Sequence, residues 1–140
     1  MDDLKREINL KSRISDKISE IIKDLEEFQT LEIPELEDYI RDIKIKAAAE
    51  RYFEKIVEGI ISTTLLIIRL KKFSVPESEE HAFLILANIN VISKDFAKRL
   101  KEAKDMRNRI VHNYITIDDS IVYRAISEEL IKDTEEFLEQ

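Results

Sequence analysis

The chain has 140 residues, of which 44% are hydrophobic and 38% charged, and its formal net charge is −7. This length suits one domain over residues 1–140 with a buried core, whereas one glycine and two prolines are too few for a turn-rich β fold. The lack of cysteine excludes disulfides and thiolate metal sites, and the net acidity alone argues against a general nucleic-acid binder.

The start of the chain and its apolar runs give no sign of export or of a membrane span. Residues 1–7 are mostly charged and lack the apolar run of a signal peptide. The longest apolar stretch, residues 59–68, is interrupted by Ser62, Thr63 and Thr64 and is far shorter than the ~20 residues that a membrane span needs. We therefore expect a cytoplasmic protein that does not cross a membrane.

The first predicted element is an amphipathic helix over residues 3–28. Its apolar side chains recur every three or four positions, which places them on one stripe. A break follows at residues 30–34, and Pro34 suits the first turn of the next helix because its fixed φ matches helical geometry. The stripe comprises Ile14, Ile18, Ile21, Ile22, Leu25 and Phe28.

The second predicted helix covers residues 35–72, with room for a bend. Residues 60–70 are apolar almost all round, so this helix lies at the centre of a bundle or also faces a second subunit. Its wide apolar face comprises Phe53, Val57, Ile60, Ile61, Thr64, Ile67 and Ile68.

A short helix over residues 77–87 is predicted next, with Phe83, Leu84 and Leu86 facing the core. Residues 73–76 form the connection before it, because the residue that precedes a proline disfavours helix.

The last two predicted helices carry their own start signals. Ser93 is a typical N-cap for a helix over residues 94–112. Asp118 or Asp119 caps a final helix that ends near Leu138. The sequence therefore predicts an all-α, antiparallel bundle of four to five helices with short loops. The inward residues of the final helix are Val122, Ile126, Leu130 and Phe137.

The segment with candidate chemistry is residues 106–114, which read Met-Arg-Asn-Arg-Ile-Val-His-Asn-Tyr. Each residue of an α-helix turns by about 100°, so Arg107 and His112 diverge by roughly 140° on a straight helix. For both side chains to touch one phosphate, the helix must end or bend near His112, or the site must draw on two chains. We expect a combination, with the motif at a helix end that faces a two-fold axis.

Arginine and histidine suit RNA cleavage without a metal. A base must take the proton of the 2′-hydroxyl, an acid must protonate the leaving oxygen, and a cation must offset the charge on phosphorus. Histidine suits both proton transfers because its free pKa is ~6.5, and arginine donates two parallel hydrogen bonds to phosphate. One chain supplies one motif histidine, whereas a homodimer supplies two copies of His112 and of Arg107.

Arg107, His112 and Tyr114 resemble the R-x4-H-x-Y signature of the HepT family in the HEPN superfamily, and Asn108 fits the family's usual Arg-Asn start. Three other segments resemble the family in the right order, so the likeness covers most of the chain. They are residues 49–61, 75–86 and 117–123.

The resemblance implies a HEPN-like homodimer and a metal-independent endoribonuclease toxin that cleaves RNA, with tRNA as a candidate substrate. It implies that Arg107 and His112 are catalytic and that no cofactor or metal takes part. It also implies a partner, an MntA-type minimal nucleotidyltransferase antitoxin that adds AMP to Tyr114. An AMP group beside Arg107 and His112 would occupy the substrate phosphate site and add negative charge.

The charge near the motif is opposite in sign to that of the whole chain. Residues 94–109 contain seven basic and three acidic residues, which gives +4 within a chain of net −7. Clustered cations are typical of phosphate binding, so we expect this strip to guide RNA towards the motif. The basic residues are Lys94, Lys98, Arg99, Lys101, Lys104, Arg107 and Arg109.

Ordinary structural interpretations compete with these roles. Arg107 could pair with Asp105 or Glu102. His112 could be a helix-end histidine favoured by the helix dipole, and Tyr114 could be a packing residue. A non-catalytic HEPN interaction module, which binds a nucleotidyltransferase or a nucleotide, is the alternative function, and a purely structural bundle is the third.

Five other polar residues have weaker signals. Asn108 supports the site by orienting the histidine or contacting RNA, or it has a helix-end role. Arg109 is a supporting phosphate contact or a surface residue. His81 is expected on the surface. The aligned pair Arg51 and Glu58 could support the site, but such a pair is more typical of surface charge.

Overall fold

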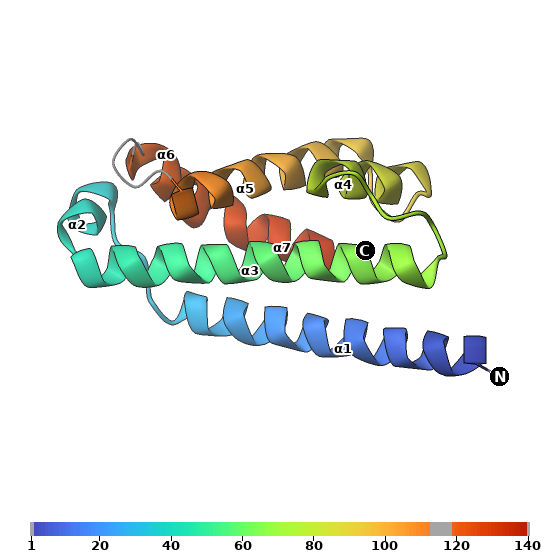
Figure 1. Ribbon diagram of the computed structural model, residues 1–140. Helices are drawn as coiled ribbons and strands as arrows, with labels where there is room; N and C mark the ends of the chain where they lie inside the picture. The colour runs from blue at the N-terminus through green and yellow to red at the C-terminus, as the bar shows by residue number, and fades with distance from the viewer. Residues whose placement is uncertain (1, 113–118, 140) are drawn as a thin grey trace.

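The computed structural model describes residues 2–112 and 119–139, and within these residues every regular element is helical. Figure 1 shows the helices as a bundle, which confirms the predicted all-α class. The elements are α1 (Asp2–Gln29), α2 (Leu36–Arg41), α3 (Ile43–Leu70), α4 (Glu79–Asn88), α5 (Lys94–His112), α6 (Asp119–Arg124), a π-helical turn η1 (Ala125–Glu129) and α7 (Leu130–Glu139).

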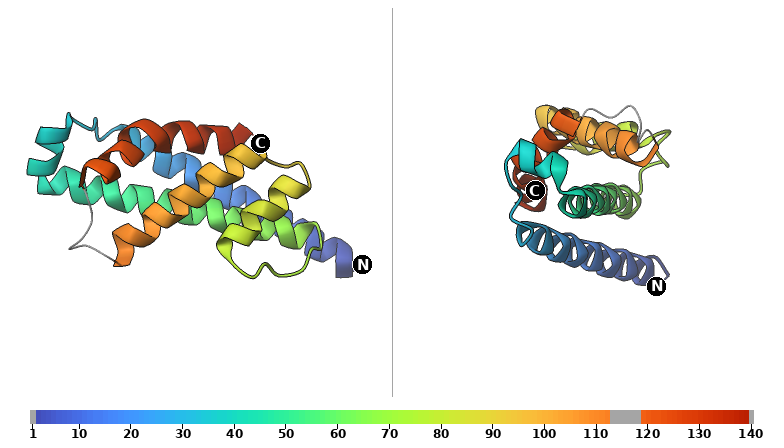
Figure 2. Two further views of the ribbon diagram at one scale, coloured as in Figure 1. Left: turned by 90° about the horizontal axis from the view of Figure 1, so that it is seen from above. Right: turned by 90° about the vertical axis from the view of Figure 1, so that its left-hand side faces the viewer.

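Helix α3 is the central element, as its all-round apolar stretch predicted. It packs against α1, α4, α5 and α7, and α1 and α3 run antiparallel (Figures 1 and 2). Phe53, Ile56 and Ile60 of α3 are buried in the common core. No helix within the described residues combines the length and the apolar character that a bilayer crossing requires.

The predicted helix over residues 35–72 is broken at Asp42, which separates α2 from α3. Asp42 has φ −92° and ψ 93°, and its carboxylate accepts hydrogen bonds from the backbone N–H groups of Lys44 and Ile45, both at 3.1 Å. This N-cap stabilises the new start enough to interrupt the helix. Pro34 lies before α2, outside its first turn.

Local caps set the two helices that lead to the motif. Ser78 accepts a hydrogen bond from the His81 N–H at 3.0 Å, so α4 begins at Glu79 and not at residue 77. Ser93 caps α5 as predicted, because its hydroxyl accepts from the Phe96 N–H at 3.0 Å. Leu84 is 48% exposed, so its predicted inward orientation is wrong.

The only glycine of the chain allows α1 to approach α3 closely. A Cβ atom at Gly59 would lie 2.8 Å from the buried Ile21 Cγ1, which is closer than carbon atoms can sit without a shift. The close packing of α1 on α3 at this point therefore depends on the absence of a side chain at Gly59.

The last predicted helix is present from Asp119 onwards but contains a π-helical turn over residues 125–129. Val122, Ile126 and Leu130 are buried, as expected from their spacing. A π turn inserts one residue into a helix and re-aims the side chains around it. The Tyr123 hydroxyl donates to the Pro34 carbonyl at 2.7 Å and ties α6 to the α1–α2 loop.

Candidate functional site

The position of the motif is fixed by the buried face of α5. Phe96, Ala97, Leu100 and Ile110 are buried in the core and lie along one side of the helix. Residues between them point to the neighbouring helices or to solvent. The described part of α5 extends to His112, and the expected end of the helix at the motif stays a prediction because residues 113–118 lie outside the described residues.

The Arg107 guanidinium is held by groups from three helices. Its Nη2 lies 2.8 Å from Glu79 Oε2 at the start of α4, and its Nη1 lies 4.0 Å from Glu58 Oε1 on α3. Its Nε donates to Asn108 Oδ1 at 3.0 Å. The Arg107 side chain is 14% exposed, against 36% for Glu79 and 47% for Glu58. A mostly buried cation therefore contacts two carboxylates that are more exposed to solvent.

Two of these partners were not identified from the sequence. We expected Asp105 or Glu102 to compete for Arg107, but Asp105 pairs with Lys101 and Lys104 at 3.5 and 3.2 Å. Glu58 was expected to be a surface charge or a support of the site, and Glu79 had no assigned role. The Glu79 contact spans 28 positions of the chain, a separation that helical periodicity cannot predict.

His112 is the last residue of α5 and is exposed. Five helical positions separate it from Arg107, so within one chain the two side chains point in directions roughly 140° apart. The amide oxygen of Asn108 accepts the hydrogen bond from Arg107 Nε, which favours a role in holding the arginine over the expected role in orienting the histidine. One protomer therefore does not direct both motif side chains at one phosphate.

Tyr114, the candidate modification site, lies outside the described residues. Its predicted role therefore stays a prediction that rests on the motif.

The predicted basic strip of α5 is largely neutralised by carboxylates. Arg99 lies 3.0 Å from Asp133 and 2.5 Å from Glu136, both on α7. Lys101 and Lys104 share Asp105, and Arg107 is held as described above. These ion pairs reduce the positive charge that the strip offers to a phosphate, and its role as a phosphate footprint stays a prediction.

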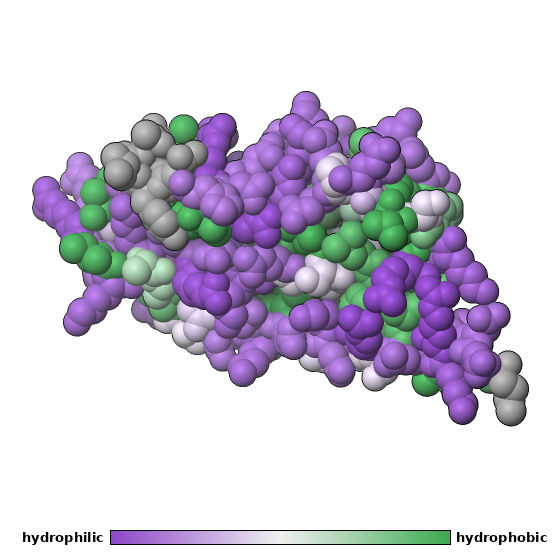
Figure 3. All heavy atoms as spheres, viewed as in Figure 1, coloured by the Kyte–Doolittle hydropathy of each residue, from purple (hydrophilic) through white to green (hydrophobic). Residues whose placement is uncertain are grey.

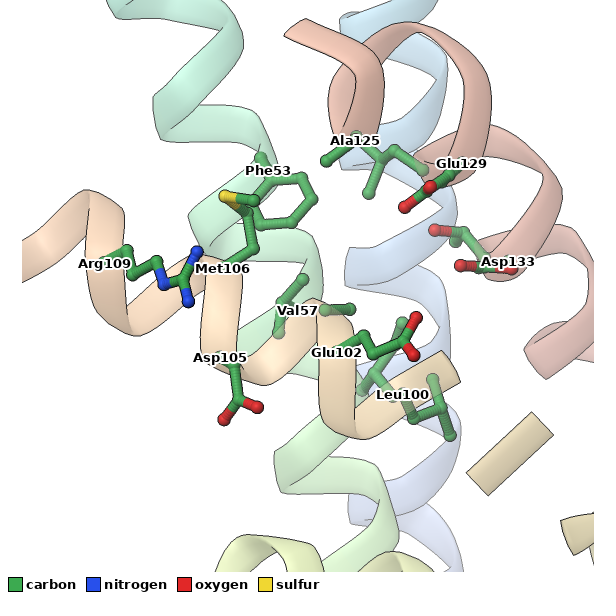
Figure 4. A pocket seen from close by; sticks show the side chains of 14 residues that line it. Phe53, Val57, Leu100, Glu102, Asp105, Met106, Arg109, Ala125, Glu129 and Asp133 are labelled. Atoms are coloured by element: carbon green, nitrogen blue, oxygen red, sulfur yellow. The ribbon is translucent and has the colours of Figure 1, made fainter. Parts of the chain in front are cut away.

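A cavity of about 260 Å³ lies beside the motif, between α3, α5 and the η1–α7 segment (Figure 4). Figure 4 shows Glu102, Glu129 and Asp133 on one side of it and Arg109 on the other. Burial raises the pKa of Glu129 and of Asp133, and for Asp133 this outweighs the lowering effect of Arg99. An apolar cavity with this many carboxylates at its edge disfavours a phosphate group.

The remaining candidate residues have local partners. His81 is exposed, and its Nδ1 accepts from the Glu77 N–H at 3.1 Å at the start of α4. Arg51 pairs with Glu54 at 3.0 Å. In residues 2–112 and 119–139, no three histidine or acidic side chains come together in a way that could hold a metal ion.

A helical bundle with an arginine and a histidine five residues apart on one core helix agrees with the HEPN-type class that the resemblance implied. A profile of the family described as "Ribonuclease HepT-like" matches residues 18–140, so the chain belongs to this family. The resemblance seen in the motif is confirmed.

Individual relatives agree with this assignment. The chain is 27% identical over 103 residues to a tRNA nuclease HepT of Aphanizomenon flos-aquae, covering 74% of this chain and 70% of the relative. It is 25% identical over 99 residues to an mRNA nuclease HepT of Shewanella oneidensis, covering 71% and 74%. The fold matches a tri-AMPylated Shewanella oneidensis HEPN toxin, solved in complex with its MNT antitoxin, with TM-score 0.81, 23% identity and coverage of 90% and 93%.

Proposed function

We propose that the protein is the endoribonuclease toxin of a HEPN/nucleotidyltransferase pair, and that it cleaves RNA in the cytoplasm as a homodimer. The observation that carries the proposal is the held guanidinium of Arg107, five residues before an exposed histidine at a helix end. Membership of the HepT-like family and the nuclease activity named for both relatives support it.

The geometry of α5 supports a dimer. Because Arg107 and His112 diverge on α5, we expect a phosphodiester that contacts both side chains to lie between two protomers. Exposed isoleucines at the same end of the bundle support such a contact: Ile40 is 43% exposed, Ile43 79% and Ile121 48%.

The proposed reaction is attack of the 2′-oxygen on the neighbouring phosphorus. His112 of one protomer takes the 2′-hydroxyl proton, the new oxygen–phosphorus bond forms, and the bond to the 5′-oxygen breaks. The partner's His112 gives a proton to that leaving oxygen, which yields a cyclic phosphate and a 5′-hydroxyl. Arg107 from each protomer offsets the charge on the non-bridging oxygens.

Arg107 already has two carboxylate neighbours, so phosphate must replace one of them. The Glu58 contact at 4.0 Å is the longer and its side chain the more exposed, so it is the one that RNA displaces. Glu79 and Asn108 then keep the guanidinium plane fixed, which leaves an N–H pair free for phosphate.

The test is cleavage of labelled total RNA by the His112→Ala protein, with His81→Ala as matched control. We expect His112→Ala to lose about 10²–10⁴-fold in rate with unchanged fold and dimer, and His81→Ala to retain full activity. Activity is expected to survive excess chelator. Full activity of His112→Ala, or strict dependence on a divalent metal, contradicts the mechanism and favours the non-catalytic interaction module.

Control by a nucleotidyltransferase of the MntA type is the second part of the proposal. The AMPylated state of the Shewanella toxin and its complex with an antitoxin support it. Incubation with the partner and ATP is expected to add AMP to Tyr114 and to stop cleavage, and Tyr114→Phe to abolish the addition. Mass spectrometry that places AMP elsewhere contradicts this role of Tyr114.

A further inference from the structure

An apolar groove of about 390 Å³ lies between α1, the second half of α3 and the connection that leads to α4. Exposed apolar side chains border it: Leu65 is 37% exposed, Phe73 46% and Val75 88%. The right-hand part of Figure 3 shows apolar atoms between strongly hydrophilic ones on this face. Such a surface is costly to leave in water and indicates a binding site.

The charged side chains that line this groove are Arg13, Lys17 and Arg69, with no carboxylate among them. Arg13 and Arg69 form no ion pair within the described part of the chain, and the pair between Lys17 and Glu20, at 3.4 Å, is exposed. The groove is therefore positive in a chain of net −7, whereas the cations of α5 are mostly neutralised.

The turn after α3 exposes both an aromatic ring and further cations. Lys72 has φ 61°, a conformation that costs a non-glycine residue roughly 1–2 kcal/mol. The N–H of Phe73 closes the turn on the Ile68 carbonyl at 3.1 Å. The ring of Phe73 stays half exposed beside the exposed side chains of Lys71 and Lys72.

The groove lies on the face of α3 that also reaches the motif. Glu58 and Arg69 are eleven residues apart, which places them within about 20° of each other and about 16 Å apart along the helix. Glu58 contacts Arg107, and Arg69 lines the groove. A strand that leaves the Arg107 phosphate site along this face meets the groove after about five stacked nucleotides of ~3.4 Å each.

We propose that this groove is a second binding site for single-stranded RNA, where a base stacks on Phe73 and the flanking phosphates contact Arg13 and Arg69. The chemistry is that of RNA-binding grooves in general: an exposed ring for the base and cations for the backbone. An acidic protein segment fits the charges equally well, but the exposed ring and the alignment with Arg107 favour RNA. The inference rests on the proposed nuclease function and extends its substrate contacts.

The test measures binding alone, in a His112→Ala background that cannot cleave. The probe is a fluorescein-labelled oligouridine of about 12 nucleotides, within the usual span of one such site, followed by anisotropy at two salt concentrations. We expect Phe73→Ala to weaken binding about tenfold, and Arg13→Gln and Arg69→Gln each to lower the salt slope by about 1. The matched control is Lys132→Gln, which removes an exposed cation from α7, behind α3 in Figure 1.

Unchanged affinity in the three groove variants, or an equal loss in Lys132→Gln, overturns the inference while leaving the nuclease proposal intact. Retained RNA binding with loss of the nucleotidyltransferase partner in Arg69→Gln overturns it too, because the groove is then a protein site. If the wild-type protein cleaves no RNA, but the groove variants bind RNA more weakly than the protein with an unchanged groove, the nuclease proposal fails and the binding site stands.

Discussion

Arg99 and Arg107 lie two turns apart on α5, and carboxylates of other helices hold both of them. The Arg99 guanidinium has close contacts to Asp133 and Glu136 and also lies 5.0 Å from the centre of the Phe96 ring. Arg107 has one close carboxylate and a second at 4.0 Å. An ion pair alone therefore does not distinguish a structural arginine from one that binds substrate. Arg107, whose second carboxylate contact is long, is the arginine that can bind a phosphate.

Lysine substitution is expected to separate the two arginines most strongly. Arg107→Lys keeps the charge but loses the planar fork, so we expect RNA cleavage to fall at least about 100-fold. Arg99→Lys is expected to change the rate less than about threefold. Initial rates with one RNA substrate measure both, and equal losses in the two variants contradict the division of roles.

For stability we expect the opposite order: alanine at Arg99 costs more than alanine at Arg107. Arg99→Ala leaves two carboxylates without their partner, and we expect the free energy of unfolding to fall by about 1–3 kcal/mol. Arg107→Ala removes a cation from two more exposed carboxylates and is expected to cost at most about 1 kcal/mol. Urea unfolding compares the two, and a larger loss for Arg107→Ala assigns it a mainly structural role.

The two carboxylates of Arg107 are also expected to differ from each other. Glu79→Gln weakens the contact that orients the guanidinium, so we expect kcat to fall about tenfold with little change in KM. Glu58→Gln, the matched control, removes the contact that phosphate displaces and is expected to lower KM without lowering kcat. The assignment of Glu79 as a positioning residue fails if its variant changes KM alone.

The smallest expected effect concerns the carboxylates at the edge of the apolar cavity between α3, α5 and the η1–α7 segment. The pKa of Glu129 and that of Asp133 are raised by burial, so the folded state binds more protons than the unfolded state just above the usual carboxylate range. Stability contributed by these groups is therefore lost as pH rises towards neutral. Glu129→Gln is expected to raise stability at about pH 7 by less than about 1 kcal/mol and to flatten the pH dependence. Thermal unfolding at about pH 5 and pH 7 tests this, and a steeper dependence contradicts it.

The fold was predictable where local signals decide it. The spacing of apolar residues and the Ser93 cap placed the start and the buried face of α5 correctly. The break at Asp42 was missed because the polar residues around it also suit a continuous helix, and only the cap geometry separates α2 from α3. The π turn at residues 125–129 has no periodic signal of its own.

The site was predictable in its motif but not in its surroundings. Arg107 and His112 were identified by their resemblance to the family motif, whereas Glu79 meets Arg107 only through the packing of α4 on α5. The same cause explains why the ion pairs of the basic strip were not predicted, since the partners of Arg99 lie 34 and 37 positions away. Counting charges along the sequence does not predict ion pairs between different helices.

The most direct test of the shared site is the activity of mixed dimers made from wild-type and His112→Ala subunits in equal amounts. If one phosphodiester needs a histidine from each protomer, only the dimers with two wild-type chains cleave RNA, and activity falls to about one quarter for random C2 pairing. Activity of about one half, in proportion to the wild-type chains present, contradicts the need for a histidine from each protomer.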